Sequence, residues 1–166
     1  MSRLTERAVA TAVPSLLDEP IKSVGRPDPV SVRPGTSLAA CLEAIRHTGM
    51  GDSVLVTDES GKLLGVLTER DIFANLVGPD VDLDVPVESM MNREPNTLHL
   101  DQPVRDAIQL MKTGRFRNVP LIDDQRTLVG VVRPQNILKF LAEAFPEELL
   151  NLPPRPHQRL RASEGA

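Results

Sequence analysis

Two stretches of the chain share one pattern of apolar and polar positions. Residues 21–60 match residues 87–126 at a constant offset of 66, and after one residue is lost in the second copy the match continues at an offset of 65. There Leu63–Val66 corresponds to Leu128–Val131. A fixed internal period predicts two copies of one structural unit.

Each copy begins with a short extended segment and an amphipathic helix. The extended segments are Pro29–Val32 and Pro95–Leu98. In both helices apolar residues recur at i, i+3, i+4 and i+7, which is the spacing of one helix face. These residues are Leu38, Cys41, Leu42 and Ile45 in the first copy, and Val104, Ala107, Ile108 and Met111 in the second.

A hairpin and a second helix complete each copy. The first strand of each hairpin is predicted over 53–56 and 119–122, and the second ends near Leu67 and Val132. The last helices begin at Thr68 and Arg133, which gives the order β-α-β-β-α. The predicted class is α/β (α+β).

A unit of about 60 residues buries too little surface to be more than marginally stable alone, so we expect the two repeats to pack sheet to sheet around a pseudo-two-fold axis. The repeats are placed at 20–78 and 86–144. An N-terminal extension covers 1–19, and a Pro-rich, basic tail covers 146–166.

Composition narrows the function classes. The formal net charge is −4 and the aromatic residues are four Phe with no Tyr or Trp, which disfavours a nucleic-acid binder because such proteins use basic surfaces and stacking rings. Cys41 is the single cysteine, so no disulfide can form within the chain and a cytoplasmic location is expected. No apolar run reaches the roughly 18 residues of a membrane span.

No pattern of catalytic or metal-ligating residues stands out. His47, His99 and His157 have no second ligand at a recognisable spacing, so no metal is predicted. A nucleophile elbow and a phosphate-binding P-loop are both missing from the sequence, which predicts a protein that is not an enzyme. Cys41 lies on the apolar helix face and is expected to be a core residue.

The duplicated β-α-β-β-α pattern resembles a pair of CBS domains, the arrangement called a Bateman module. The resemblance runs from about Pro20 to about Ala144 and rests on Gly65-Val66-Leu67-Thr68-Glu69-Arg70-Asp71, which fits Gly-apolar-x-[Ser/Thr]-x-x-Asp at the join of the last strand and helix. It implies a stand-alone regulatory pair that binds AMP, ADP or ATP between its repeats, with S-adenosylmethionine or NAD as other ligands. It also implies a homodimer whose signal is read by an unknown protein partner.

The resemblance places one ligand site in the first copy, at Val30, Ser31, Gly65, Thr68 and Asp71. Asp71 would hold the ribose hydroxyls, since a carboxylate accepts two hydroxyl protons at once. Thr68 would contact phosphate at a helix start, where the free N–H groups favour an anion. Val30 and Ser31 would flank the adenine.

The second copy departs from the signature, with Arg133 in place of Ser/Thr and Asn136 in place of Asp. Its candidate site is altered or empty. The resemblance makes Arg117 the preferred phosphate ligand there, since family members often carry a basic residue at this place, whereas the first copy has Gly51-Asp52 and cannot supply positive charge. The candidate residues are Thr97, Arg117, Asn118, Pro120, Gly130, Arg133 and Asn136.

Other interpretations of the same residues stay open. Thr68-Glu69-Arg70-Asp71 also fits a capped helix start that needs no ligand. A constitutive dimerisation or scaffold module with a decayed nucleotide site is therefore the alternative to a nucleotide sensor. A nucleic-acid binder using Arg115 to Arg117 and the tail is the third.

Overall fold

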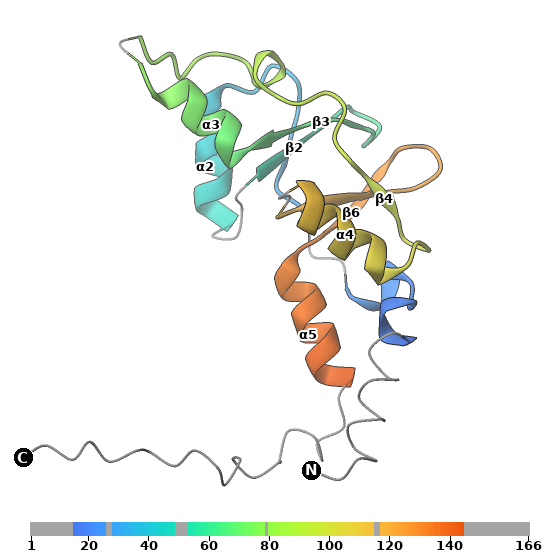
Figure 1. The fold of residues 1–166 in the computed structure, drawn as a ribbon. Helices are drawn as coiled ribbons and strands as arrows, with labels where there is room; N and C mark the ends of the chain where they lie inside the picture. Colours follow the sequence, from blue (N-terminus) through green and yellow to red (C-terminus); the bar gives the residue numbers. More distant parts are fainter. Residues whose placement is uncertain (1–14, 26–27, 49–52, 79, 115–116, 145–166) are drawn as a thin grey trace, which may run out of the picture.

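The computed structural model describes residues 15–25, 28–48, 53–78, 80–114 and 117–144. The predicted tail at 146–166 and most of the N-terminal extension lie outside the described residues. The first copy contains β1 (Ser31–Val32), α2 (Leu38–Thr48), β2 (Ser53–Thr57), β3 (Leu63–Thr68) and α3 (Glu69–Leu76). The second contains β4 (Leu98–His99), α4 (Val104–Gly114), β5 (Val119–Ile122), β6 (Leu128–Val132) and α5 (Pro134–Ala144). Figure 1 shows them as two similar units.

Each copy forms its own three-stranded sheet. The strand orders are β1-β2-β3 and β4-β5-β6, with the first pair parallel and the second antiparallel in both sheets. The registers correspond as well, since Ser31 pairs with Leu55 and Leu98 pairs with Leu121. The predicted β-α-β-β-α order is confirmed in both copies.

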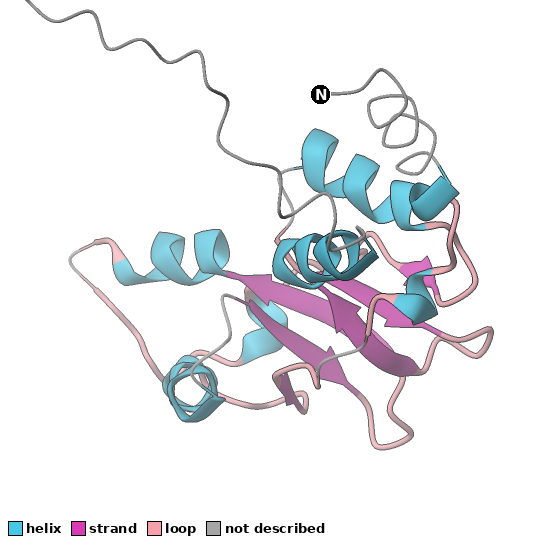
Figure 2. Ribbon diagram, turned by 90° about the horizontal axis from the view of Figure 1, so that it is seen from below, coloured by secondary structure: helices cyan, strands magenta, loops and turns pink. Residues whose placement is uncertain are grey.

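The two sheets meet along the ends of their hairpins. The Leu63 amide donates to the Arg126 carbonyl at 3.0 Å, and the Leu128 amide donates to the Gly61 carbonyl at 2.9 Å. Beneath these bonds, Leu55, Leu63, Val66 and Ile122 form one apolar cluster with Leu128 packed against it. The strands gather in the centre with helices on the outside, as Figure 2 shows. The expected sheet-to-sheet packing is therefore present.

The helices bury the predicted apolar face. Leu38 and Cys41 of α2 are fully buried, as are Val104 and Ala107 of α4. Cys41 is thus a core residue, as expected, and burial raises the pKa of its thiol.

The copies exchange the segments that precede their sheets. The 3-10 turn η1 (Ile21–Ser23) belongs by sequence to the first copy, but Ile21 is buried in the core of the second. The turn η2 (Val87–Ser89) leads into the second copy, and Val87 is buried in the core of the first. Backbone bonds fix both turns, including Ile21 N–H to the Gln102 carbonyl at 2.9 Å and Val87 N–H to the Thr36 carbonyl at 2.8 Å.

Candidate functional site

A pocket of about 700 Å³ lies at the junction of the two copies, a size within the range of about 300–1,000 Å³ typical of small-molecule sites. Its lining comes from β2, β3 and α3 of the first copy, from the segment before β4, and from α4 and β5 of the second. The lining residues are Ser53, Val66, Thr68, Glu69, Arg70, Phe73, Asn92, Pro95, Asn96, Thr113, Gly114, Arg117, Asn118 and Pro120.

The N-terminus of α3 opens on this pocket through Thr68. The Thr68 hydroxyl accepts from the Asp71 amide at 3.4 Å, while Asp71 Oδ2 accepts from the Thr68 amide at 2.8 Å and from its hydroxyl at 2.6 Å. These bonds make a capping box, so the predicted cap is confirmed. The first-turn amides of Glu69 and Arg70 have no acceptor within the helix, which makes this helix end suited to an anion.

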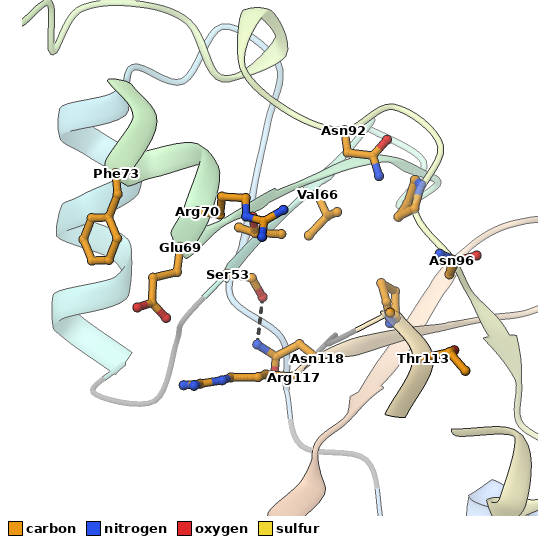
Figure 3. A pocket seen from close by; sticks show the side chains of 14 residues that line it. Ser53, Val66, Glu69, Arg70, Phe73, Asn92, Asn96, Thr113, Arg117 and Asn118 are labelled. Carbon is orange, nitrogen blue, oxygen red and sulfur yellow. Dashed lines mark hydrogen bonds between the residues drawn. The ribbon is translucent and has the colours of Figure 1, made fainter. Parts of the chain in front are cut away.

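A chain of hydrogen bonds links the two copies at the pocket. Asn118 Nδ2 donates to Ser53 Oγ at 2.9 Å, the bond drawn in Figure 3. Asn118 Oδ1 in turn accepts from Arg133 Nε at 2.9 Å. Both amide atoms of Asn118 are therefore held, and its orientation is fixed by partners from both copies.

Two arginines bring positive charge to the pocket from opposite copies. In Figure 3 Arg70 extends from α3 beyond the Ser53 end of the Ser53–Asn118 bond, and Arg117 extends from the segment before β5 at its Asn118 end. Both are exposed, and within the described part of the chain neither makes an ion pair or a side-chain hydrogen bond. Glu69 is the one acidic residue of the lining.

Apolar side chains form part of the wall. Val66 of β3, Phe73 of α3, Pro95 and Pro120 line the pocket, with Pro120 buried and Phe73 56% exposed. A wall of this kind can pack against a flat, uncharged ring system, while the arginines and the helix end face a charged group. The pocket thus suits a ligand with one apolar and one anionic end.

The residues expected in the first-copy site are distributed over several places. Thr68 lines the pocket, whereas Asp71 is half-buried and engaged in the cap, without being part of the lining. Val30 is buried in the first copy's core, and Ser31 is exposed on β1. Gly65 lies under the segment at Met91 and Asn92.

Three residues expected in the second-copy site line this same pocket. They are Arg117, Asn118 and Pro120. Arg133 lies behind them through its bond to Asn118, and Asn136 Oδ1 accepts from the Arg133 amide at 3.2 Å, which repeats the backbone half of the Thr68–Asp71 cap. Thr97 is half-buried and Gly130 is buried, and neither belongs to the lining. Thr68 of the expected first-copy site and these three residues of the expected second-copy site therefore line one pocket.

The sequence candidates did not include ten of the lining residues. They are Ser53, Val66, Glu69, Arg70, Phe73, Asn92, Pro95, Asn96, Thr113 and Gly114. Arg70 stands inside the signature and could have been found there. The others depend on which loop of one copy faces which strand of the other, and local periodicity carries no such information.

Among the described residues, no group of three or more His, Cys, Asp or Glu side chains is placed to hold a metal ion. None of the helices in the described ranges is long and apolar enough to cross a membrane.

Solved structures with the same fold contain adenosine compounds. The CBS domain pair of protein MJ0100, in complex with 5'-methylthioadenosine and S-adenosyl-L-methionine, matches with a TM-score of 0.65 and 25% identity, over 76% of this chain and 98% of that chain. The cytosolic domain of the Mg2+ channel MgtE, in complex with ATP, matches with a TM-score of 0.64 and 26% identity, over 80% of this chain and 53% of that chain.

Similar sequences occur in archaea. An uncharacterized 17.7 kDa protein of Acidianus ambivalens is 29% identical over 112 residues, which are 68% of this chain and 66% of the relative. An uncharacterized protein of Methanopyrus kandleri is 29% identical over 133 residues, which are 78% of this chain and 67% of the relative. The matches thus span about two thirds of both relatives.

The family model described as the CBS domain matches residues 21–78 and again residues 87–143. These two matches coincide with the two β-α-β-β-α copies. The chain belongs to the CBS domain family and carries two CBS domains in tandem.

Proposed function

We propose that the chain is a regulatory module that binds an adenine nucleotide in the pocket between its two CBS domains. The observation that carries this is the meeting of the α3 N-terminus of the first domain with Arg117 and Asn118 of the second around one pocket. A CBS domain pair of the same fold has been solved with S-adenosyl-L-methionine and 5'-methylthioadenosine, and the similar cytosolic domain of a Mg2+ channel has been solved with ATP. All three ligands share an adenosine group.

The chemistry of the lining supports a separate place in the pocket for each part of the ligand. The adenine packs against the apolar wall at Val66, Pro95 and Pro120, and the phosphate faces Thr68 and the first turn of α3. Asp71 is not itself part of the lining, but it lies directly behind Thr68 through the cap, and we assign the ribose to its Oδ1, which takes part in no hydrogen bond among the described residues.

Nucleotide binding changes the arrangement of the two domains because residues of both domains line the pocket. A ligand that contacts both favours the arrangement in which the two halves of the pocket are correctly spaced, and so shifts the population toward that arrangement. The shift is read by a protein partner, or through a homodimer whose geometry changes, in the cytoplasm, where adenine nucleotides report the energy state.

A second candidate is a constitutive assembly module that binds no nucleotide. It is favoured by two exposed apolar residues at corresponding positions of the two domains, Phe73 of α3 at 56% exposure and Leu138 of α5 at 66%. Val77, directly after α3, is 82% exposed. Outward apolar residues of this kind suit a contact between two copies of the chain.

One experiment separates the candidates. Thermal unfolding of the chain is measured with AMP, ADP, ATP, S-adenosylmethionine and methylthioadenosine, alongside Asp71→Ala. A ligand at 100 times its dissociation constant stabilises the fold by about 2.7 kcal/mol, which corresponds to roughly 5–10 °C in Tm. We expect that shift for the wild type and its loss in Asp71→Ala.

The matched control is Ser37→Ala. Ser37 Oγ accepts from the Ala40 amide at 3.3 Å at the start of α2, so this variant also loses a helix-start hydrogen bond but lies outside the pocket lining. It should keep the ligand-induced shift. If no compound shifts Tm while sedimentation shows a dimer that survives dilution, the assembly module is the better description.

A further inference from the structure

Arg133 takes the place in the second domain that Thr68 has in the first, but its side chain makes a different contact. Thr68 lines the pocket, whereas Arg133 is half-buried and lies outside the lining. Its Nε donates to Asn118 Oδ1 at 2.9 Å, and its backbone is held as well, because the Arg133 amide donates to Asn136 Oδ1 at 3.2 Å. Arg133 therefore reaches the pocket through Asn118, which does line it.

The bond from Arg133 decides which way the Asn118 amide faces. An arginine Nε can only donate a hydrogen bond, so the amide oxygen has to face it. The amide nitrogen then faces the other way, and this Nδ2 donates to Ser53 Oγ at 2.9 Å, the bond drawn in Figure 3. An amide turned by 180° would set its N–H2 group against the Nε–H of Arg133, donor against donor, and Arg133 would lose its acceptor.

The orientation of Asn118 in turn decides what Ser53 offers to a ligand. The two bonds run in one direction, from Arg133 to Asn118 and from Asn118 to Ser53, and we call this series the donor relay. Since the Ser53 oxygen accepts from Asn118, its hydroxyl hydrogen points elsewhere, and within the described residues it donates to no protein acceptor. Ser53 lines the pocket, so this hydrogen is available to an acceptor atom of a ligand.

We infer that Arg133 is a positioning residue of the nucleotide pocket: it fixes the orientation of the Asn118 amide and thereby makes Ser53 a hydrogen-bond donor to the bound ligand. The inference rests on the proposed function and deepens it. The second domain has no Ser or Thr at this place of the signature, and the arginine found there serves the pocket that both domains share.

Two uncharged substitutions of nearly equal length separate this role from a direct effect of the arginine charge. In Arg133→Gln a side-chain nitrogen is bonded to Cδ, as Nε is in arginine, so a donor to Asn118 is kept. In Arg133→Met a methyl carbon takes that place and the donor is lost. Isothermal titration measures the affinity of both variants for AMP, ATP and S-adenosylmethionine. Arg133→Gln should bind within about three-fold of the wild type, and Arg133→Met roughly ten-fold more weakly.

Further variants locate the effect within the donor relay. Ser53→Ala removes its last donor and should also lower affinity roughly ten-fold. Asn118→Ala removes its middle, so adding Arg133→Met in that background should weaken binding no further. These comparisons test the relay from its other end, and thermal unfolding of each variant without ligand checks that the fold is intact.

The matched control is Arg33→Met. Arg33 also donates side-chain hydrogen bonds, to the Thr57 carbonyl at 3.2 Å and to the Thr57 hydroxyl at 3.1 Å, but it lies outside the pocket lining. This variant loses the same charge and the same kind of bond as Arg133→Met. It should keep the wild-type affinity for all three compounds.

The outcomes separate the donor relay from the function on which it rests. Equal losses in Arg133→Gln and Arg133→Met would mean that Arg133 acts through its charge, and wild-type affinity in both would mean that it does not act on the pocket. Either result, or a further loss from Arg133→Met in the Asn118→Ala background, overturns the inference while a nucleotide-binding module remains. If none of the three compounds binds the wild type, the proposed function and the inference fall together.

Discussion

Gly65 lies where β3 and the segment joining the two CBS domains come closest. A Cβ placed on Gly65 would sit 2.6 Å from Met91 Sδ and 2.8 Å from the Asn92 carbonyl oxygen. That oxygen accepts from the Val66 amide at 2.9 Å, and the Asn92 amide donates back to the Val66 carbonyl at 2.8 Å. The glycine of the signature thus has a structural reason to be a glycine, separate from any ligand.

Gly65→Ala should destabilise the chain by about 1–3 kcal/mol, the usual cost of forcing an extra carbon into a packed site. The methionine side chain can turn away, but the Asn92 oxygen belongs to the backbone and can retreat only by breaking the bond that it accepts from the Val66 amide. Urea unfolding gives the free energy directly. A change under about 0.5 kcal/mol would mean that the joining segment moves aside freely.

At the scale of elements, α3 depends on its capping box. The Thr68 hydroxyl and the Asp71 carboxylate each satisfy groups at the helix start, and Thr68 also lines the pocket. Two roles can therefore rest on one residue, and they differ in what they require. A cap needs only an oxygen acceptor on residue 68, whereas a ligand contact also depends on what is bound.

Thr68→Ala should cost about 1 kcal/mol of stability without nucleotide, whereas Thr68→Ser, which keeps the hydroxyl, should cost little. Urea unfolding of both variants checks this. ATP titration then separates the two roles: affinity lost in Thr68→Ala and kept in Thr68→Ser indicates a ligand contact. Wild-type affinity in Thr68→Ala would leave Thr68 as a cap alone.

The elements were the part of the fold that the sequence predicted best. Helix faces at Leu38–Ile45 and Val104–Met111, the hairpins, and the Thr68 cap all depend on residues close in sequence, and all are present. The pocket depends on contacts between distant segments, such as Ser53 with Asn118. Because the two copies have similar sequences, an apolar segment of one copy would fit the core of either copy equally well. Local sequence patterns therefore cannot tell which of the two cores a segment joins.

At the scale of the whole molecule, the exchanged turns η1 and η2 tie the cores of the two domains together. Ile21 is buried in the second domain's core with Leu98 and Val104, and Val87 is buried in the first domain's core with Leu38 and Cys41. Each domain is therefore completed by a residue that the sequence repeat assigns to the other. The two domains should unfold as one cooperative unit, because neither core is closed by its own repeat.

Ile21→Ala should destabilise the chain by about 2–5 kcal/mol, as expected for a buried isoleucine. Hydrogen exchange under native conditions should show the first loss of protection in α4 and β5, in the domain that does not contain residue 21. Val87→Ala is the matched variant and should weaken α2 and β2 first. Loss of protection confined to the repeat that carries the substitution would contradict the exchange.

The exchanged turns also set the order in which the chain can fold as it leaves the ribosome. The first domain's sheet and helices end at Leu76, yet its core stays open until Val87 has been synthesised. Ile21 emerges early but finds its buried place only after β5 and β6 exist. A partly synthesised chain therefore exposes apolar surface at both ends of its first domain. The first domain becomes stably folded only after the second domain has been synthesised.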